Sequence, residues 1–258
     1  MSDAARLFQA VFSMVSRFWP NMLEDNRITL AYMITGILRS KSVQFRKVAQ
    51  TVRYSYQNTS LEDRFRRFVR NSNIVVAVEF LPLTELILSA VSRERLVLLV
   101  DSTKIGGGCI CLMVSVLYKN RALPLGWIVF KGKKGHSCQD MQHALFRAIQ
   151  SLIPDERPVI LLGDGEFDGS RVIEWFETGT TWQYVCRTTN TTLVWYQGRW
   201  IALKDFPLTA GQGGFLTGVR FTQSGQVGPV NILVVWNKKE GCHWFFVTNF
   251  DTQAEVRQ

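Results

Sequence analysis

The feature that most constrains the fold is a pair of short apolar runs that each end on an aspartate. The first run covers residues 95–101 (RLVLLVD) and the second covers residues 158–164 (PVILLGD). A continuous apolar run of this length is typical of a strand that is buried on both faces. The two runs therefore predict interior strands that carry Asp101 and Asp164 to the rim of a sheet.

Strand and helix patterns follow one another in a defined order across the middle of the chain. Strands are predicted at 95–101, 109–118, 122–130, 159–164 and 182–187, and helices at 139–153 and 170–177. The order β-β-β-α-β-α-β is that of an RNase H-like sheet, in which a helix leads from the third strand to a fourth that lies beside the first. This adjacency would bring Asp101 and Asp164 together.

The predicted fold class is α/β, with an RNase H-like mixed sheet in residues 94–187. Residues 1–93 carry apolar residues at helical spacing and predict a helical domain in front of the sheet. Residues 188–250 alternate between apolar and polar positions and are divided by glycine-rich turns, which predicts an antiparallel β insertion. Residues 251–258 are expected to begin a further helix, with Asp251 at the N-cap position.

Asp101 and Asp164 are the strongest candidates for a chemical role. A single aspartate after a strand is usually a turn or N-cap residue. Two that map to the same rim favour a metal site, because carboxylate oxygens are the ligands that Mg²⁺ prefers. Two bound Mg²⁺ ions would activate a water or a 3′-hydroxyl for phosphodiester exchange, and such a site needs a third acidic ligand.

The segment that begins at Asp164 also imitates the start of an EF-hand loop. The twelfth position of that loop would be Trp175, where a bidentate glutamate is needed, and a strand precedes the segment instead of a helix. The EF-hand interpretation is therefore rejected.

Positive charge is concentrated in the helical segment. The chain has a net charge of +9, and nine basic residues against two acidic ones lie between Leu38 and Asn71. Two short predicted helices in this segment resemble a helix-turn-helix. A solvated basic face on a small helical bundle is the simpler explanation, but the local excess favours contact with phosphate groups. The candidate DNA-binding residues are Arg46, Lys47, Arg64, Arg67 and Arg70.

Two further candidates lie in the sheet region. Lys131, Lys133 and Lys134 follow the third strand, and a phosphate-binding loop and a flexible solvated loop are equally compatible with them. Trp244 alternates with apolar residues, so core packing is the first explanation and stacking on a nucleic-acid base the second.

Some classes of protein are disfavoured. The chain has no apolar run of ~18 residues, so no membrane span is expected. The five cysteines form no CxxC pair and lie mostly in apolar runs, which predicts buried free thiols in a reducing cytoplasm.

The motifs taken together resemble the cut-and-paste DDE transposases of bacterial insertion sequences, in the group founded on the fourth numbered insertion sequence. The matching residues are Val100-Asp101-Ser-Thr, the block Gly163-Asp164-x-x-Phe167-x-x-Ser170, and Trp244-x-x-x-Thr248-Asn249 at the end of the β insertion. The basic helical segment in front of them fits the same family.

The resemblance implies a role for each candidate residue. Asp101 and Asp164 would be the first two metal-binding, catalytic carboxylates, with Mg²⁺ as cofactor and Mn²⁺ as a substitute. Trp244 would stack on a base that is flipped out of the transposon end during hairpin formation. The partners would be terminal-repeat and target DNA, bound by a homodimer in the bacterial cytoplasm, at the nucleoid.

One departure from the family separates two hypotheses. The third acid of the family lies in a Tyr-x-x-Arg-x-x-x-Glu helix, and Glu255 comes too early after Trp244 to be that residue. The chain is therefore expected to lack the catalytic glutamate, as a truncated transposase would. The alternatives are a Mg²⁺-dependent transposase and an inactive DNA-binding remnant or inhibitor, with another RNase H-like nuclease as a third.

Overall fold

A computed structural model describes residues 2–52, 58–91, 94–133, 135 and 137–252. The chain divides into two compact units, residues 1–83 and 84–258, which are described separately below. The first unit is helical, and the second is built on one large sheet.

The helical unit packs its helices around two small apolar cores. Its elements are α1 (Asp3–Phe18), α2 (Glu24–Ser40), α3 (Phe45–Thr51), α4 (Asn58–Val69), α5 (Val76–Glu79) and the first turn of α6 (Leu81–Ala90). Val15 and Ala31 are fully buried between α1 and α2, while Phe65 of α4 is fully buried against Val48 of α3. Helices α3 and α4 confirm the two predicted short helices, and the turn between them, residues 53–57, lies outside the described residues.

Ten strands form the sheet of the second unit, in the order β3-β2-β1-β4-β5-β10-β9-β8-β6-β7. Strands β1, β4 and β5 run parallel, and the other pairings are antiparallel. The strands are β1 (Leu96–Gly106), β2 (Cys109–Tyr118), β3 (Arg121–Lys131), β4 (Val159–Gly163), β5 (Gln183–Thr188), β6 (Leu193–Tyr196), β7 (Arg199–Ala202), β8 (Gly214–Phe221), β9 (Val227–Asn237) and β10 (Cys242–Thr248).

These positions confirm the predicted order of elements between residues 94 and 187. The prediction that the first strand ends at Asp101 is wrong, because β1 stays paired with β2 as far as Gly106. Strand β4 lies beside β1, and the helices α7 (Gln139–Gln150) and α8 (Ser170–Thr178) lie where the helical spacing predicts them. The predicted β insertion is present as β6 to β10, which continue the same sheet rather than forming a separate layer. The helix predicted at 251–258 falls mostly outside the described residues.

The boundary between the two units comes ten residues earlier than the predicted domain boundary at 93. Most of α6 belongs with the sheet, because Leu88 and Val91 join the core of the sheet unit. The hydroxyl of Thr84 donates to the carbonyl oxygen of Leu125 on β3, at 2.7 Å, and Arg157 donates to the carbonyl oxygen of Leu88 at 2.8 Å.

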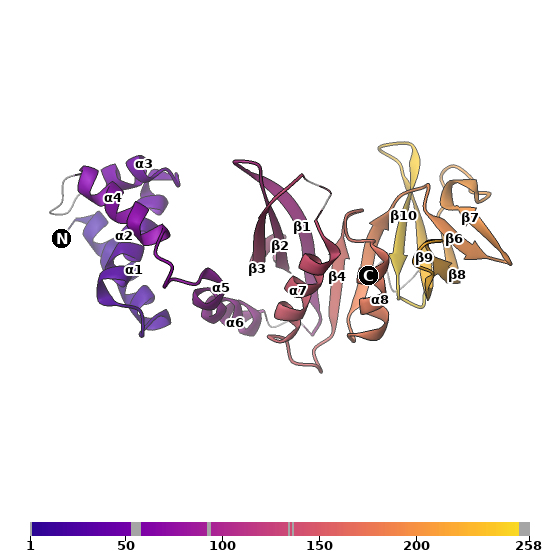
Figure 1. The fold of residues 1–258 in the computed structure, drawn as a ribbon, viewed down its shortest axis with the longest axis horizontal. Coiled ribbons are helices and arrows are strands. Elements are labelled where there is room, and N and C mark those ends of the chain that lie inside the picture. The colour runs from indigo at the N-terminus through magenta and orange to yellow at the C-terminus, as the bar shows by residue number, and fades with distance from the viewer. Residues whose placement is uncertain (1, 53–57, 92–93, 134, 136, 253–258) are drawn as a thin grey trace. The chain divides into compact units, whose positions relative to one another are not determined.

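The main core lies on one face of the sheet, under α7 and α8. Figure 1 shows both helices on the same side of the strands. Alternate residues of β1 (Leu96, Leu98 and Val100) point into this core, where they meet Phe146 of α7 and Ile173 of α8. The intervening residues Val97 and Leu99 are only half-buried, so the two faces of the sheet differ in how far they are covered.

Two other sequence expectations were tested by the structure. No helix among the described residues is long and apolar enough to cross a membrane. Cys111 and Cys186 are buried thiols as predicted, but the prediction is wrong for Cys138 and Cys242, which are exposed. Cys138 is the N-cap residue of α7, and Cys242 begins β10 directly after a turn, so neither faces the core.

Candidate active site on β1 and at the end of β4

Asp101 and Asp164 occupy adjacent positions on neighbouring parallel strands. Asp101 lies within β1, which continues to Gly106, and Asp164 directly follows the end of β4. In the pairing of β1 with β4, Val100 lies opposite Gly163. Asp101 directly follows Val100 in the sequence, and Asp164 directly follows Gly163. Val100 and Gly163 face the core, since a Cβ added to Gly163 would lie 3.2 Å from Cγ1 of Val100. Because successive residues of a strand alternate in direction, both aspartates lie toward the other face, and both are exposed.

Backbone groups orient each carboxylate. The N–H of Ser102 donates to Oδ1 of Asp101 at 2.8 Å, and the N–H of Glu166 donates to Oδ1 of Asp164 at 3.0 Å. Gly163 is required beneath this pair, because its Cβ would come within 2.9 Å of Cβ of Phe167. A larger residue at 163 would displace the turn that carries Asp164.

Glu166 ties three segments together next to the aspartates. Its carboxylate accepts hydrogen bonds from the hydroxyl of Ser102 on β1 and from both the N–H and the hydroxyl of Ser137, the N–H at 2.8 Å. Gln142 of α7 donates to the hydroxyl of Ser137 at 2.8 Å and to the carbonyl oxygen of Glu166 at 3.2 Å. Burial alone would raise the pKa of Glu166, but these hydrogen bonds outweigh burial and hold the pKa below its usual value.

These contacts assign Glu166 a positioning role, in agreement with its placement in the turn. Replacing it with alanine is expected to lower the free energy of unfolding of the sheet unit by about 1–3 kcal/mol, because the buried hydroxyl of Ser102 loses its acceptor. Glutamine at the same position keeps an acceptor for Ser137 and is expected to cost less. Urea denaturation of both variants checks this difference, and equal stabilities would contradict it.

Asp168 is the other acidic residue near Asp164. It is half-buried, and burial raises the pKa of its carboxyl group, while a hydrogen bond with Thr188 acts in the opposite direction and the nearby charge of Asp164 raises the pKa further. Among the residues that the structure describes, no group of three histidine, cysteine, aspartate or glutamate side chains is arranged to hold a metal ion. The pair Asp101 and Asp164 therefore stands without a third such ligand in the described part, and Glu255 lies outside it.

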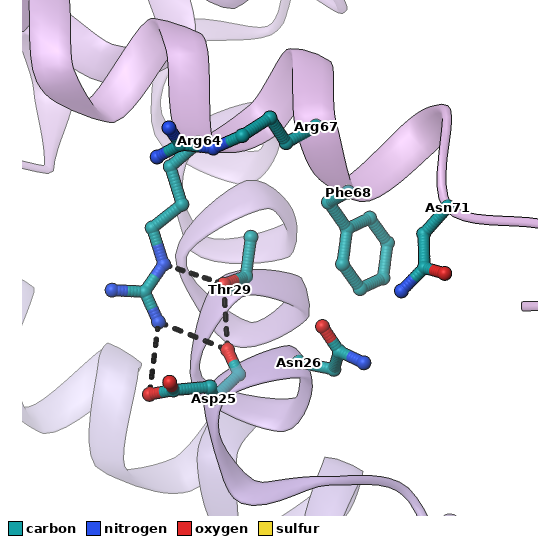
Figure 2. Close-up of a pocket in the computed structure, with 7 residues that line it drawn as sticks. All are labelled: Asp25, Asn26, Thr29, Arg64, Arg67, Phe68 and Asn71. Atoms are coloured by element: carbon teal, nitrogen blue, oxygen red, sulfur yellow. Dashed lines mark hydrogen bonds and ion pairs between the residues drawn. The ribbon is translucent and has the colours of Figure 1, made fainter. Parts of the chain in front are cut away.

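The basic residues predicted in the helical unit fall into two groups. Arg46 and Lys47 on α3, and Arg67 and Arg70 on or just after α4, are exposed. Arg64 differs from them, as Figure 2 shows, because its guanidinium reaches across to α2.

The contacts of Arg64 join α4 to the start of α2. The guanidinium donates to the hydroxyl of Thr29 at 2.6 Å and to the carbonyl oxygen of Asp25 at 2.9 Å, and lies 3.5 Å from the carboxylate of Asp25. Arg67, in contrast, lies at the edge of the pocket lined by these residues and by Phe68 and Asn71 (Figure 2). Arg64 thus has a structural role in packing the helices, although it shares the helix face of Arg67 in the sequence pattern.

The lysine loop follows β3. Lys131 and Lys133 are exposed, and Lys134 lies outside the described residues. The loop ends at Ser137. Because Ser137 donates hydrogen bonds to Glu166, the end of the loop lies at the turn that carries Asp164.

Trp244 lies on β10, opposite Val235 of β9, and is half-buried. Its indole N–H donates to the carboxylate of Glu240 at 3.1 Å. The guanidinium of Arg187, on β5, stands 4.2 Å from the centre of the indole ring. Sequence reasoning missed Arg187, which it treated only as the end of a strand; the available signal was that Arg187 falls on the strand face opposite to that of Cys186.

Comparisons with known proteins add a distant structural likeness. No protein-family model matches the chain, and no curated protein matches it. Among solved structures, the chain is similar to a piggyBac transposase determined in a synaptic complex with hairpin DNA, with a TM-score of 0.49 and 10% sequence identity. The similarity covers 97% of this chain and 59% of that one. A likeness at this level transfers no function, so the transposase family stays a prediction from the sequence motifs.

Proposed function

We propose that the chain is a DNA-binding protein of the DDE transposase type, with an RNase H-like sheet, and that Asp101 and Asp164 serve DNA strand cleavage and transfer at transposon ends. The observation that carries the proposal is the parallel pairing of β1 with β4, which puts the two aspartates at adjacent positions of neighbouring strands. Two strands that were predicted separately from the sequence thus meet where the proposed chemistry requires them.

The two carboxylates suit Mg²⁺ in the number and type of donors. Mg²⁺ commonly binds one or two carboxylates and keeps several waters or substrate phosphates in its remaining positions. Both aspartates are exposed, which leaves room for such additional ligands. The bound ion, for which Mn²⁺ would substitute, supplies activation of a water or 3′-hydroxyl and stabilisation of the leaving oxygen.

The residues of the chain have distinct tasks in this proposal. Asp101 and Asp164 hold their positions through the N–H groups of Ser102 and Glu166, so the carboxylates need little rearrangement before binding. Arg46, Lys47, Arg67 and Arg70, together with the lysines of the loop after β3, contact DNA phosphates. Trp244 offers a ring face for an unstacked base.

The second candidate function is DNA binding without strand cleavage. This function is favoured because two acidic ligands, rather than three, come together in the described part of the chain. The two candidates share the phosphate contacts and differ in whether the aspartates support catalysis.

The DNA-binding part of the proposal predicts a strong dependence on salt. The four phosphate contacts proposed in the helical unit give by themselves a slope of about −4 in the logarithm of affinity against the logarithm of salt concentration, or about a 250-fold loss between 50 and 200 mM salt. Replacing Arg67 and Arg70 together with glutamine is expected to reduce this slope by about 2. Fluorescence anisotropy with labelled duplex DNA measures both quantities.

A matched control is the double replacement of Arg6 and Arg17 with glutamine, since both are exposed on α1 of the same unit. An unchanged slope in the Arg67/Arg70 variant, or an equal loss in the control, would overturn the assignment of the phosphate contacts. Nicking of a supercoiled plasmid that carries the DNA flanking the coding sequence, with Mg²⁺ and with EDTA, then separates the two candidates. Nicking that needs Mg²⁺ supports the transposase, while salt-dependent binding without nicking supports the second function.

A further inference from the structure

Arg187 has a position on β5 that is equivalent to the position of Asp164 relative to β4. In the pairing of β4 with β5, Gly163 lies opposite Cys186, and Arg187 is the next residue, as Asp164 is on β4. The turn after Asp164 passes close by, since a Cβ on Gly165 would lie 3.7 Å from the carbonyl oxygen of Arg187. Cys186 is fully buried in the core, so alternation directs Arg187 toward the face of the sheet that carries the aspartates.

The guanidinium is held by an aromatic ring rather than by a carboxylate. Arg187 pairs with Phe246 on the neighbouring strand β10. Trp244 lies two residues before Phe246, on the same face of β10, and the guanidinium of Arg187 lies 4.2 Å from the centre of its ring. The ring is itself fixed, because its N–H donates to Glu240 and its edge packs near Phe246. Within the described residues, the guanidinium forms no ion pair with an acidic side chain, and Arg187 is exposed.

This combination is that of a preorganised anion-binding group. A guanidinium stacked on an indole keeps its charge and its planar set of N–H donors, which match the oxygens of a phosphate group. DNA that approaches two adjacent carboxylates needs a compensating positive charge, and the strand pairing places Arg187 on β5, the strand next to the one that Asp164 follows.

We propose that Arg187 binds a phosphate of the DNA strand that lies at Asp101 and Asp164, and that Trp244 positions its guanidinium. This inference rests on the proposed function and extends it to a residue that the sequence motifs do not assign. It also restricts Trp244, because the ring face that contacts Arg187 is not available to an unstacked base.

The test is DNA binding by the full chain and its variants, measured by fluorescence anisotropy over a range of salt, with Ca²⁺ in place of Mg²⁺. Arg187→Gln is expected to weaken binding at least about tenfold and to lower the salt slope by about 1, because one charge-assisted phosphate contact is lost. Arg187→Lys keeps the slope but loses part of the affinity, since lysine lacks the planar set of donors. Trp244→Leu weakens binding while the slope stays unchanged, because the charge remains.

Arg199→Gln is the matched control, since Arg199 is an exposed arginine on β7 at the edge of the same sheet. It is expected to bind as the wild type does, and thermal unfolding checks that every variant is folded. Wild-type affinity and slope in Arg187→Gln would overturn the inference while leaving the proposed function standing. If Arg187→Gln does not fold, Arg187→Lys decides, and wild-type affinity in that variant overturns the inference. A wild-type chain without salt-dependent DNA binding would instead refute the proposed function itself.

Discussion

Replacing Asp101 or Asp164 with asparagine is expected to lower Mg²⁺-dependent nicking on the order of 10³-fold, because losing a metal-binding carboxylate removes several kcal/mol of transition-state stabilisation. The effect should be chemical rather than structural. Asparagine keeps an oxygen that accepts the N–H of Ser102 at position 101, or of Glu166 at position 164. Both aspartates are exposed and lie close to a second negative charge, so neither replacement should reduce the stability of the fold.

The measurement is the rate of plasmid nicking, alongside thermal unfolding and DNA affinity. Asp205→Asn is a suitable control, since Asp205 is an exposed aspartate in a 3₁₀ turn of the same unit. DNA binding by Asp101→Asn should be retained, because the replacement removes a charge that repels phosphates. Wild-type nicking by both aspartate variants would show that the adjoining carboxylates do not support the chemistry proposed for them.

Phe146→Ala is expected to destabilise the sheet unit by about 3–5 kcal/mol, the largest effect on stability among the variants considered. Phe146 is fully buried on α7, and its ring stacks on Trp175 of α8 at 5.8 Å and lies 5.7 Å from that of Phe176. Removing the ring leaves a cavity between α7, α8 and the sheet. The loss should extend to the active site, because Gln142 of the same helix holds Ser137 and Glu166 in place.

Urea denaturation followed by tryptophan fluorescence measures this loss, since seven of the eight tryptophans lie in the sheet unit. Leu86→Ala serves as the control, because Leu86 lies on α6 with its side chain exposed, and a change within about 0.5 kcal/mol is expected. Similar losses in the two variants would show that α7 does not depend on Phe146 for its attachment to the sheet.

Local patterns predicted the elements of the sheet with good accuracy. The strand predicted at 109–118 has these bounds in the structure as β2, and the helix predicted at 139–153 begins at Gln139. Such agreement is expected where an apolar run or a helical repeat is long and bounded by turn residues. The aspartates at 101 and 164 were found for the same reason, since each ends a run that is recognisable without its partners.

Side-chain partners that are distant in the sequence were not predictable in this way. Arg64, Arg67 and Arg70 recur at a spacing that suggests one basic face, yet Arg64 is bound to Asp25 and Thr29 of α2. Glu166 follows β4 within a short turn, but its hydrogen bonds reach Ser102 and Ser137, which are 64 and 29 residues away in the sequence.

The sequence by itself determined which segments form strands and helices, and that Asp101 and Asp164 each follow an apolar run, because these features depend on periodicity within a few residues. Only the tertiary structure decided that Arg187 lies on the strand beside Asp164 and that its guanidinium lies against Trp244. The physical reason is that the register between strands depends on how side chains pack across the sheet and against α7 and α8, which no local pattern specifies.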